Sequence, residues 1–63
     1  MPPRRLDIAI LFADGRSTKE IAQALGLAHA TVRNQLVSAY RTLGVSTRAG
    51  LRARLREATP DRV

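Results

Sequence analysis

Apolar residues recur at helical spacing along most of the chain, and glycines separate the periodic segments. Apolar positions every three or four residues mark one face of an α-helix, and a glycine just beyond such a segment is typical of a helix end. The pattern predicts an all-α fold without strands. The four helices are expected at about 3–14, 17–25 and 29–43, with the last from Ser46 or Thr47 to about Ala58.

The two central helices have the signals of a helix-turn-helix. Ser17 and Glu20 have the spacing of a capping box, in which each side chain binds the other's backbone N–H. Ala22 is small where two helices would cross, Gly26 permits a tight turn, and Leu27 can fill the corner after it. In this motif the second helix, here residues 29–43, enters the major groove of double-stranded DNA.

The longer helix has two chemically different sides. One side is apolar and is expected to pack into the core: Val32, Leu36, Ala39 and Leu43. The other side combines guanidinium, carboxamide and small apolar groups: Ala30, Arg33, Asn34, Val37 and Arg41. Arginine pairs with guanine, asparagine with adenine, and a valine methyl contacts the thymine methyl. A solvated helix face would also carry Arg and Asn, but the preceding helix and turn favour the DNA-reading interpretation.

Charge supports a nucleic-acid partner. The chain has 63 residues, 11 basic against 5 acidic, and a formal net charge of +6. Acidic residues are missing between Glu20 and Glu57, where six arginines occur, and such a stretch suits a polyanion. A GC-rich genome would explain the preference for Arg over Lys, but less readily the missing acids. Only Phe12 and Tyr40 are aromatic, which argues against single-strand or RNA binding by base stacking.

Composition also limits the other function classes. The chain is short enough for one domain, and without cysteine it has neither disulfides nor thiolate metal sites. One histidine, His29, makes a metal site improbable, and no nucleophile–base pair is evident, so we expect no cofactor, no metal, no catalytic residues and no enzyme. No apolar run is long enough to span a membrane. The expectation is a cytoplasmic, nucleoid-associated protein.

Several short motifs occur together and are specific as a set: Pro3-Arg4, Gly15, STKEIA at 17–22, Leu25-Gly26, TVRN at 31–34, Leu43-Gly44-Val45, STRA at 46–49, and Leu51. With them the chain resembles the LuxR-type helix-turn-helix family, also called the FixJ or GerE type. The resemblance implies a LuxR-type DNA-binding domain over 2–58 and transcriptional regulation in a bacterium. Residues 59–63 are expected to form a frayed tail.

The resemblance also assigns site residues by position. Arg33, Asn34 and Val37 match the base-contacting positions. The phosphate-contacting positions correspond to Thr18, Lys19, Thr31, Gln35 and Arg41. Four residues depart from the family pattern: Arg5 stands in place of Glu, Ala28 in place of an N-capping Ser or Thr, Gln35 in place of His, and Gly50 in place of Glu.

Family members usually bind DNA as dimers through the fourth helix, so the resemblance implies a homodimer on DNA. Small residues on the outer side of that helix are the interface candidates: Ala49, Gly50 and Ala53. The family commonly carries an N-terminal sensor or receiver domain, which these residues do not include. Two alternative functions remain open for this chain: the promoter-reading region of a sigma factor and a small helical protein-interaction domain.

Overall fold

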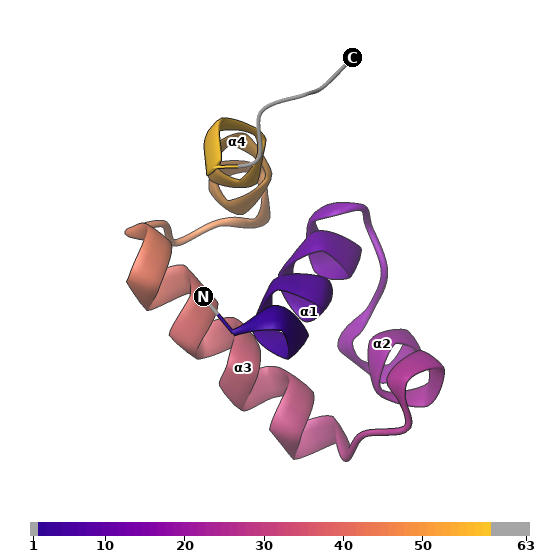
Figure 1. The fold of residues 1–63 in the computed structure, drawn as a ribbon. Coiled ribbons are helices and arrows are strands. Elements are labelled where there is room, and N and C mark those ends of the chain that lie inside the picture. The colour runs from indigo at the N-terminus through magenta and orange to yellow at the C-terminus, as the bar shows by residue number, and fades with distance from the viewer. Residues whose placement is uncertain (1, 59–63) are drawn as a thin grey trace.

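Four α-helices make up the computed structural model, which describes residues 2–58. They are α1 (Pro3–Ala13), α2 (Thr18–Leu25), α3 (His29–Leu43) and α4 (Arg48–Ala58) (Figure 1). The described part of the chain contains no strand, so the prediction of a four-helix, all-α fold is confirmed. The predicted tail at 59–63 lies outside the described residues.

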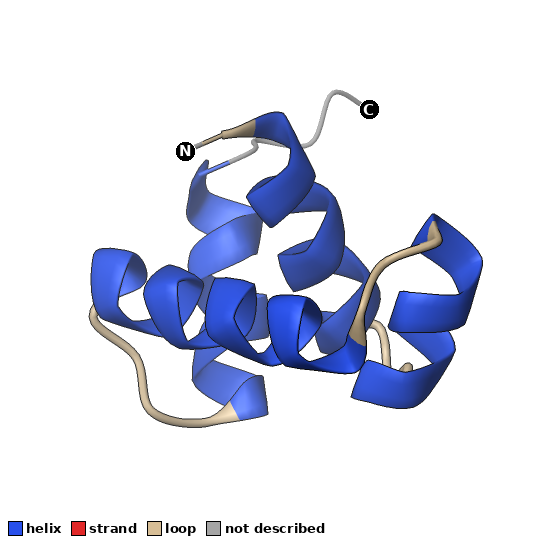
Figure 2. Cartoon of the chain, turned by 90° about the horizontal axis from the view of Figure 1, so that it is seen from below, coloured by secondary structure: helices blue, strands red, loops and turns tan. Residues whose placement is uncertain are grey.

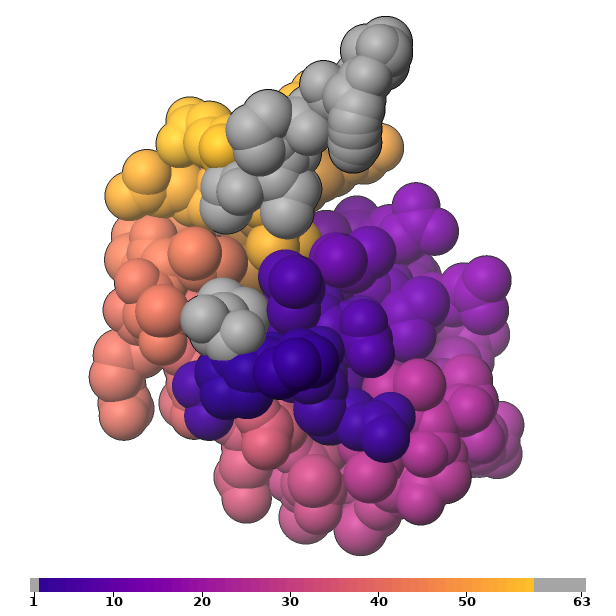
Figure 3. All heavy atoms as spheres, in the orientation of Figure 1, coloured from indigo at the N-terminus to yellow at the C-terminus, as the bar shows by residue number. Residues whose placement is uncertain are grey.

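The helices are arranged around α1, which packs against all three others. Helix α3 also contacts α2 and α4, which lie near its two ends and do not contact each other (Figure 1). Seen from below, α3 runs across the front of the molecule (Figure 2). The space-filling view shows the side chains of α3 along the lower left edge, with α1 and α2 beside them (Figure 3). This arrangement leaves one long side of α3 open to solvent.

Two hydrophobic clusters form the core. The first joins α1, α2 and α3 through Ile8, Ile21, Ala22, Val32 and Leu36. The second joins α1, α3 and α4 through Ala9, Ala13, Ala39, Leu51 and Leu55. Phe12 packs against both clusters and links them. The apolar stripe predicted for α3 is confirmed, with Leu43 only partly buried.

Helix α1 is buried on two sides. Ile8 packs in the cluster with α2 and α3, and Ala9 and Ala13 are buried on the side where α4 packs. Both are alanines, and a small side chain lets the backbones of two helices approach closely. The central position of α1 therefore requires two apolar faces, one for the helix-turn-helix and one for α4.

Local sequence signals explain the helix ends. The capping box of α2 is complete: the Glu20 N–H donates to Ser17 Oγ (3.0 Å) and the Ser17 N–H donates to Glu20 Oε1 (2.9 Å). Gly26 and Gly44 end α2 and α3 in the left-handed conformation, with φ of 66° and 68°. The Val45 N–H then donates to the Tyr40 carbonyl (3.0 Å), as expected for a glycine-ended helix. The predicted boundaries of α3 are confirmed.

Candidate nucleic-acid interface

The outward side of α3 is the candidate reading face, which we define as Arg33, Asn34, Val37 and Arg41. All four side chains are exposed, and Val37 has an exposed fraction of 54%, because the opposite side of α3 is buried against α1 and α2. The side chains of Arg33, Asn34 and Arg41 make no hydrogen bond or ion pair with the described residues. Their donors and acceptors are therefore available to base edges and phosphates.

The first turns of α2 and α3 are tied together by one hydrogen bond. Thr18 Oγ1 and His29 Nε2 lie 2.6 Å apart, and each residue is the first of its helix. Lys19 and Thr31 follow within the same two turns and are exposed. The structure thus brings three of the five predicted phosphate-contacting residues to the two adjoining helix N-termini, where backbone N–H groups favour an anion.

His29 has a structural contact that the sequence did not predict. Its position at the start of α3 was expected, but its partner Thr18 lies 11 positions earlier in the chain. Ala28 stands at the N-cap of α3 and makes no side-chain cap hydrogen bond. The start of α3 is therefore joined to α2 by the Thr18–His29 contact but has no side-chain cap of its own.

Gln35 lies on the flank of α3 that faces the beginning of α1. Arg5 Nε donates to Gln35 Oε1 over 2.8 Å, and this hydrogen bond is partly buried. Because Arg Nε can only donate, the amide oxygen of Gln35 faces Arg5 and its NH₂ group remains free to donate elsewhere. The two departures from the LuxR-type pattern at positions 5 and 35 are therefore hydrogen-bonded partners. The sequence did not indicate the pair, because 30 positions separate the two residues.

Arg48 is a further cation beside the helix-turn-helix that the sequence analysis did not single out as a site residue. Its guanidinium lies 4.0 Å from the centre of the Phe12 ring and donates to the Arg16 carbonyl over 3.4 Å. Phe12 in turn lines a shallow hollow with Leu36, Val37 and Tyr40. Arg48 thus links the start of α4 to the loop before α2 and, through Phe12, to the edge of the reading face.

The dimer candidates occupy two different environments on α4. Ala49 and Ala53 are exposed one turn apart. Gly50 instead faces the turn before α4: a Cβ atom there would meet Thr47 Oγ1 at 3.2 Å and Val45 Cβ at 3.3 Å. The Gly50 N–H donates to Thr47 Oγ1 (3.0 Å), which caps α4. Ala49 and Ala53 form the small-residue surface, and Gly50 belongs to the helix cap.

Within residues 2–58, no group of three or more His, Cys, Asp or Glu side chains is arranged to hold a metal ion. The helices of the same part of the chain are too short or too polar to cross a lipid bilayer. The functional chemistry on the described surface is that of exposed guanidiniums, amides and hydroxyls around α3 and α4.

Comparisons with known proteins agree with this geometry. A family model described as a homeodomain-like domain matches residues 3–49. The transcriptional regulatory protein MctR of Rhizobium johnstonii is 43% identical over 51 residues, which is 81% of this chain and 24% of that protein. The chain therefore spans about a quarter of the length of this relative. No solved structure matches significantly. The chain belongs to the homeodomain-like helix-turn-helix family.

Proposed function

We propose that the chain is the sequence-specific DNA-binding domain of a bacterial transcriptional regulator, with α3 in the major groove of double-stranded DNA. The observation that carries this proposal is the reading face of α3, where unpaired guanidiniums, a carboxamide and an exposed valine lie on the second helix of the helix-turn-helix. Such a mixture suits base edges, which differ in donors, acceptors and methyl groups. The family match and the similarity to a transcriptional regulator support the same class of function.

Within this class we propose the LuxR type. The motif Leu43-Gly44-Val45 and a fourth helix follow the helix-turn-helix, as that resemblance implies, and this fourth helix packs on α1. A sigma-factor region would share α2 and α3, but the α4 motif fits it less well. By the same resemblance, the chain works with an N-terminal sensor or receiver domain in the cytoplasm, and the greater length of MctR is compatible with such a domain.

The proposed residue roles follow from position. Arg33, Asn34 and Val37 contact bases. Thr18, Lys19, Thr31, Gln35 and Arg41 contact phosphates on both sides of the groove, and Arg5 positions Gln35 through their hydrogen bond. No cofactor or metal takes part.

Selection of bound sites from random duplexes tests the proposal directly. The wild-type chain should enrich one sequence, and binding should weaken as salt rises because phosphate contacts release counterions. Enrichment without any sequence preference would reduce the reading face to a phosphate-binding surface. Failure to retain duplex DNA at low salt would instead favour the alternative of a protein-interaction domain.

We further propose that two copies pair on DNA through Ala49 and Ala53 of α4, with Gly50 at the edge of the interface. Neighbouring arginines repel a second copy in solution, whereas DNA neutralises charge and sets two copies on adjacent half-sites. Ala53→Glu should then abolish cooperative binding to a paired site and spare the affinity for a single half-site. Titration of paired and single sites side by side measures this, and unchanged cooperativity would place the interface elsewhere.

A further inference from the structure

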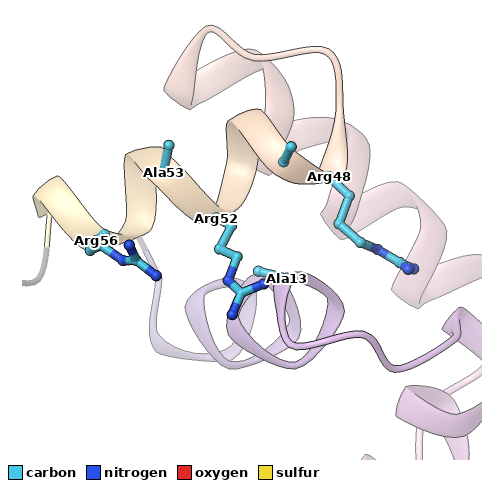
Figure 4. Close-up of a pocket in the computed structure, with 6 residues that line it drawn as sticks. Ala13, Arg48, Arg52, Ala53 and Arg56 are labelled. Atoms are coloured by element: carbon cyan, nitrogen blue, oxygen red, sulfur yellow. The ribbon is translucent and has the colours of Figure 1, made fainter.

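Helix α4 carries three arginines at intervals of one helical turn: Arg48, Arg52 and Arg56. Together with three alanines, Ala13, Ala49 and Ala53, they line an open hollow of about 360 Å³ beside the end of α1. Figure 4 shows the side chains of Arg52 and Arg56 extending from α4 toward α1, with Ala13 beside Arg52. We call this surface the arginine hollow.

The positive charge of the arginine hollow is not matched by carboxylates. Arg52 and Arg56 are exposed, and their side chains make no hydrogen bond or ion pair with the described residues. Arg48 contacts the Phe12 ring and the Arg16 carbonyl, neither of which carries a charge. Within residues 2–58, Arg54 forms an ion pair with Glu57 (3.2 Å), but neither of these residues lines the hollow. Arg52 and Arg56 thus extend toward α1 without a partner anion among the described residues, and Arg48 adds a third positive charge at the end of the hollow that lies near Phe12.

The arginine hollow also has apolar lining residues. Ala13 has an exposed fraction of 8%, and Ala49 and Ala53 are exposed on the neighbouring flank of α4, where Figure 4 shows Ala53 pointing away from the side chains of Arg52 and Arg56. A partner must therefore offer both negative charge and apolar side chains. The backbone of duplex DNA offers phosphates without apolar side chains, whereas an acidic amphipathic helix offers carboxylates and apolar groups on one face.

The location of the hollow also separates it from the reading face. Arg54 Nε donates to the Leu43 carbonyl at the end of α3 (3.1 Å), so that flank of α4 faces α3. Arg52 and Arg56 extend from another flank, toward α1 (Figure 4). A partner in the arginine hollow would leave the reading face of α3 accessible.

We propose that the arginine hollow binds an acidic amphipathic helix of a partner protein. Its carboxylates pair with Arg48, Arg52 and Arg56, and its apolar side chains cover the three alanines. Residues four positions apart repeat every ~6 Å along a helix, so glutamates at the same spacing on the partner match the arginines. Ala49 and Ala53 are also the proposed contact between two copies on DNA, so the acidic helix and a second copy would compete for this side of α4.

A designed peptide provides the probe for this inference. This peptide is a synthetic helix with glutamate at every fourth position beside a row of leucines. The control is a scrambled peptide of the same composition. Fluorescence anisotropy should show about tenfold tighter binding of the patterned peptide by the wild-type chain. Arg52→Gln/Arg56→Gln should remove that difference. Equal binding of both peptides, or binding of neither, would overturn the proposal.

A matched variant separates the hollow from the reading face. Lys19→Gln/Arg41→Gln removes the same amount of positive charge at the proposed DNA interface. We expect it to lower the affinity for a single half-site duplex by about tenfold or more and to retain the peptide. Arg52→Gln/Arg56→Gln should lose peptide binding and keep the affinity for the half-site duplex. Circular dichroism should show unchanged helical content in both variants.

The outcomes of the two assays are independent. If Arg52→Gln/Arg56→Gln weakens DNA binding as strongly as Lys19→Gln/Arg41→Gln does, the hollow belongs to the DNA interface and the peptide proposal is wrong. If the two variants weaken peptide binding equally, the attraction is one of net charge alone and the proposal is also wrong. Peptide binding by a chain that does not bind DNA would overturn the proposed function and leave the arginine hollow as a protein-binding site.

Discussion

The reading face of α3 and the arginine hollow of α4 are both exposed and basic, yet their chemistry differs. The reading face places two guanidiniums beside a carboxamide and an isopropyl group. The arginine hollow is lined, among the described residues, only by arginines and alanines. Distinguishing four base pairs requires different donors, acceptors and apolar contacts, whereas a row of like charges recognises only a matching row of anions.

The two surfaces also differ in how they are held. The flanks of α3 are fixed by the Arg5–Gln35 and Thr18–His29 hydrogen bonds, which join it to α1 and α2. In the arginine hollow, Arg52 and Arg56 have no such contact with the described residues. A recognition helix must present its side chains in a defined register, so contacts at its flanks matter. A charged docking surface tolerates mobile side chains that order when the partner binds.

The largest expected difference between the two surfaces is in how strongly salt weakens the binding of their ligands. DNA affinity should fall on the order of 10³-fold between about 50 and 200 mM salt if about six phosphates are contacted. Binding of the patterned peptide should fall much less, because part of its contact is apolar. Titrations of both ligands at several salt concentrations test this, and equal slopes would contradict the distinction.

Arg33→Ala should change sequence preference without unfolding the domain. The loss of a bidentate contact should reduce discrimination at one base pair by about 1–3 kcal/mol. Arg52→Ala, which removes the same group from α4, should leave the preference unchanged. Site selection with both variants measures the effect, and coincident profiles for wild type and Arg33→Ala would make Arg33 a phosphate contact.

Gln35→Glu should have opposite effects on stability and on DNA binding. A carboxylate still accepts from Arg5 Nε, and the charge-assisted bond should raise the free energy of unfolding by about 0.5–1 kcal/mol. The same carboxylate should repel a phosphate and lower DNA affinity about tenfold. Thermal unfolding and DNA titration of one preparation test both. Unchanged DNA affinity would remove Gln35 from the phosphate contacts.

The smallest expected effect is a change in the free energy of unfolding caused by substitution at the start of α3. Ala28→Ser should supply the missing N-cap and raise the free energy of unfolding by about 0.5–1 kcal/mol. Ser17→Ala, which removes the existing cap of α2, should lower it by a similar amount and serves as the matched control. Denaturant unfolding measures both. A destabilised Ala28→Ser variant would show that a serine side chain disturbs the Thr18–His29 contact.

Much of the fold was predictable because its signals are local. The capping box at Ser17 and Glu20, the glycines at 26 and 44 and the apolar stripe of α3 each involve residues a few positions apart, and the structure confirms them. The residue roles at the DNA interface stay predictions. Chemistry and position placed Arg33, Asn34 and Val37 on an exposed side of α3, and the structure confirms that exposure.

Tertiary structure alone decided the contacts between distant parts of the chain. The burial of Ala9 and Ala13, the Arg5–Gln35 pair and the position of Arg48 over Phe12 all depend on how α1 crosses α3 and α4. The sequence showed that α4 is rich in arginine, but not which of its guanidiniums would lack partners. Helix propensity and caps act within a turn or two, so they determine where helices form. Which flanks of those helices meet is determined by side-chain packing across the whole domain.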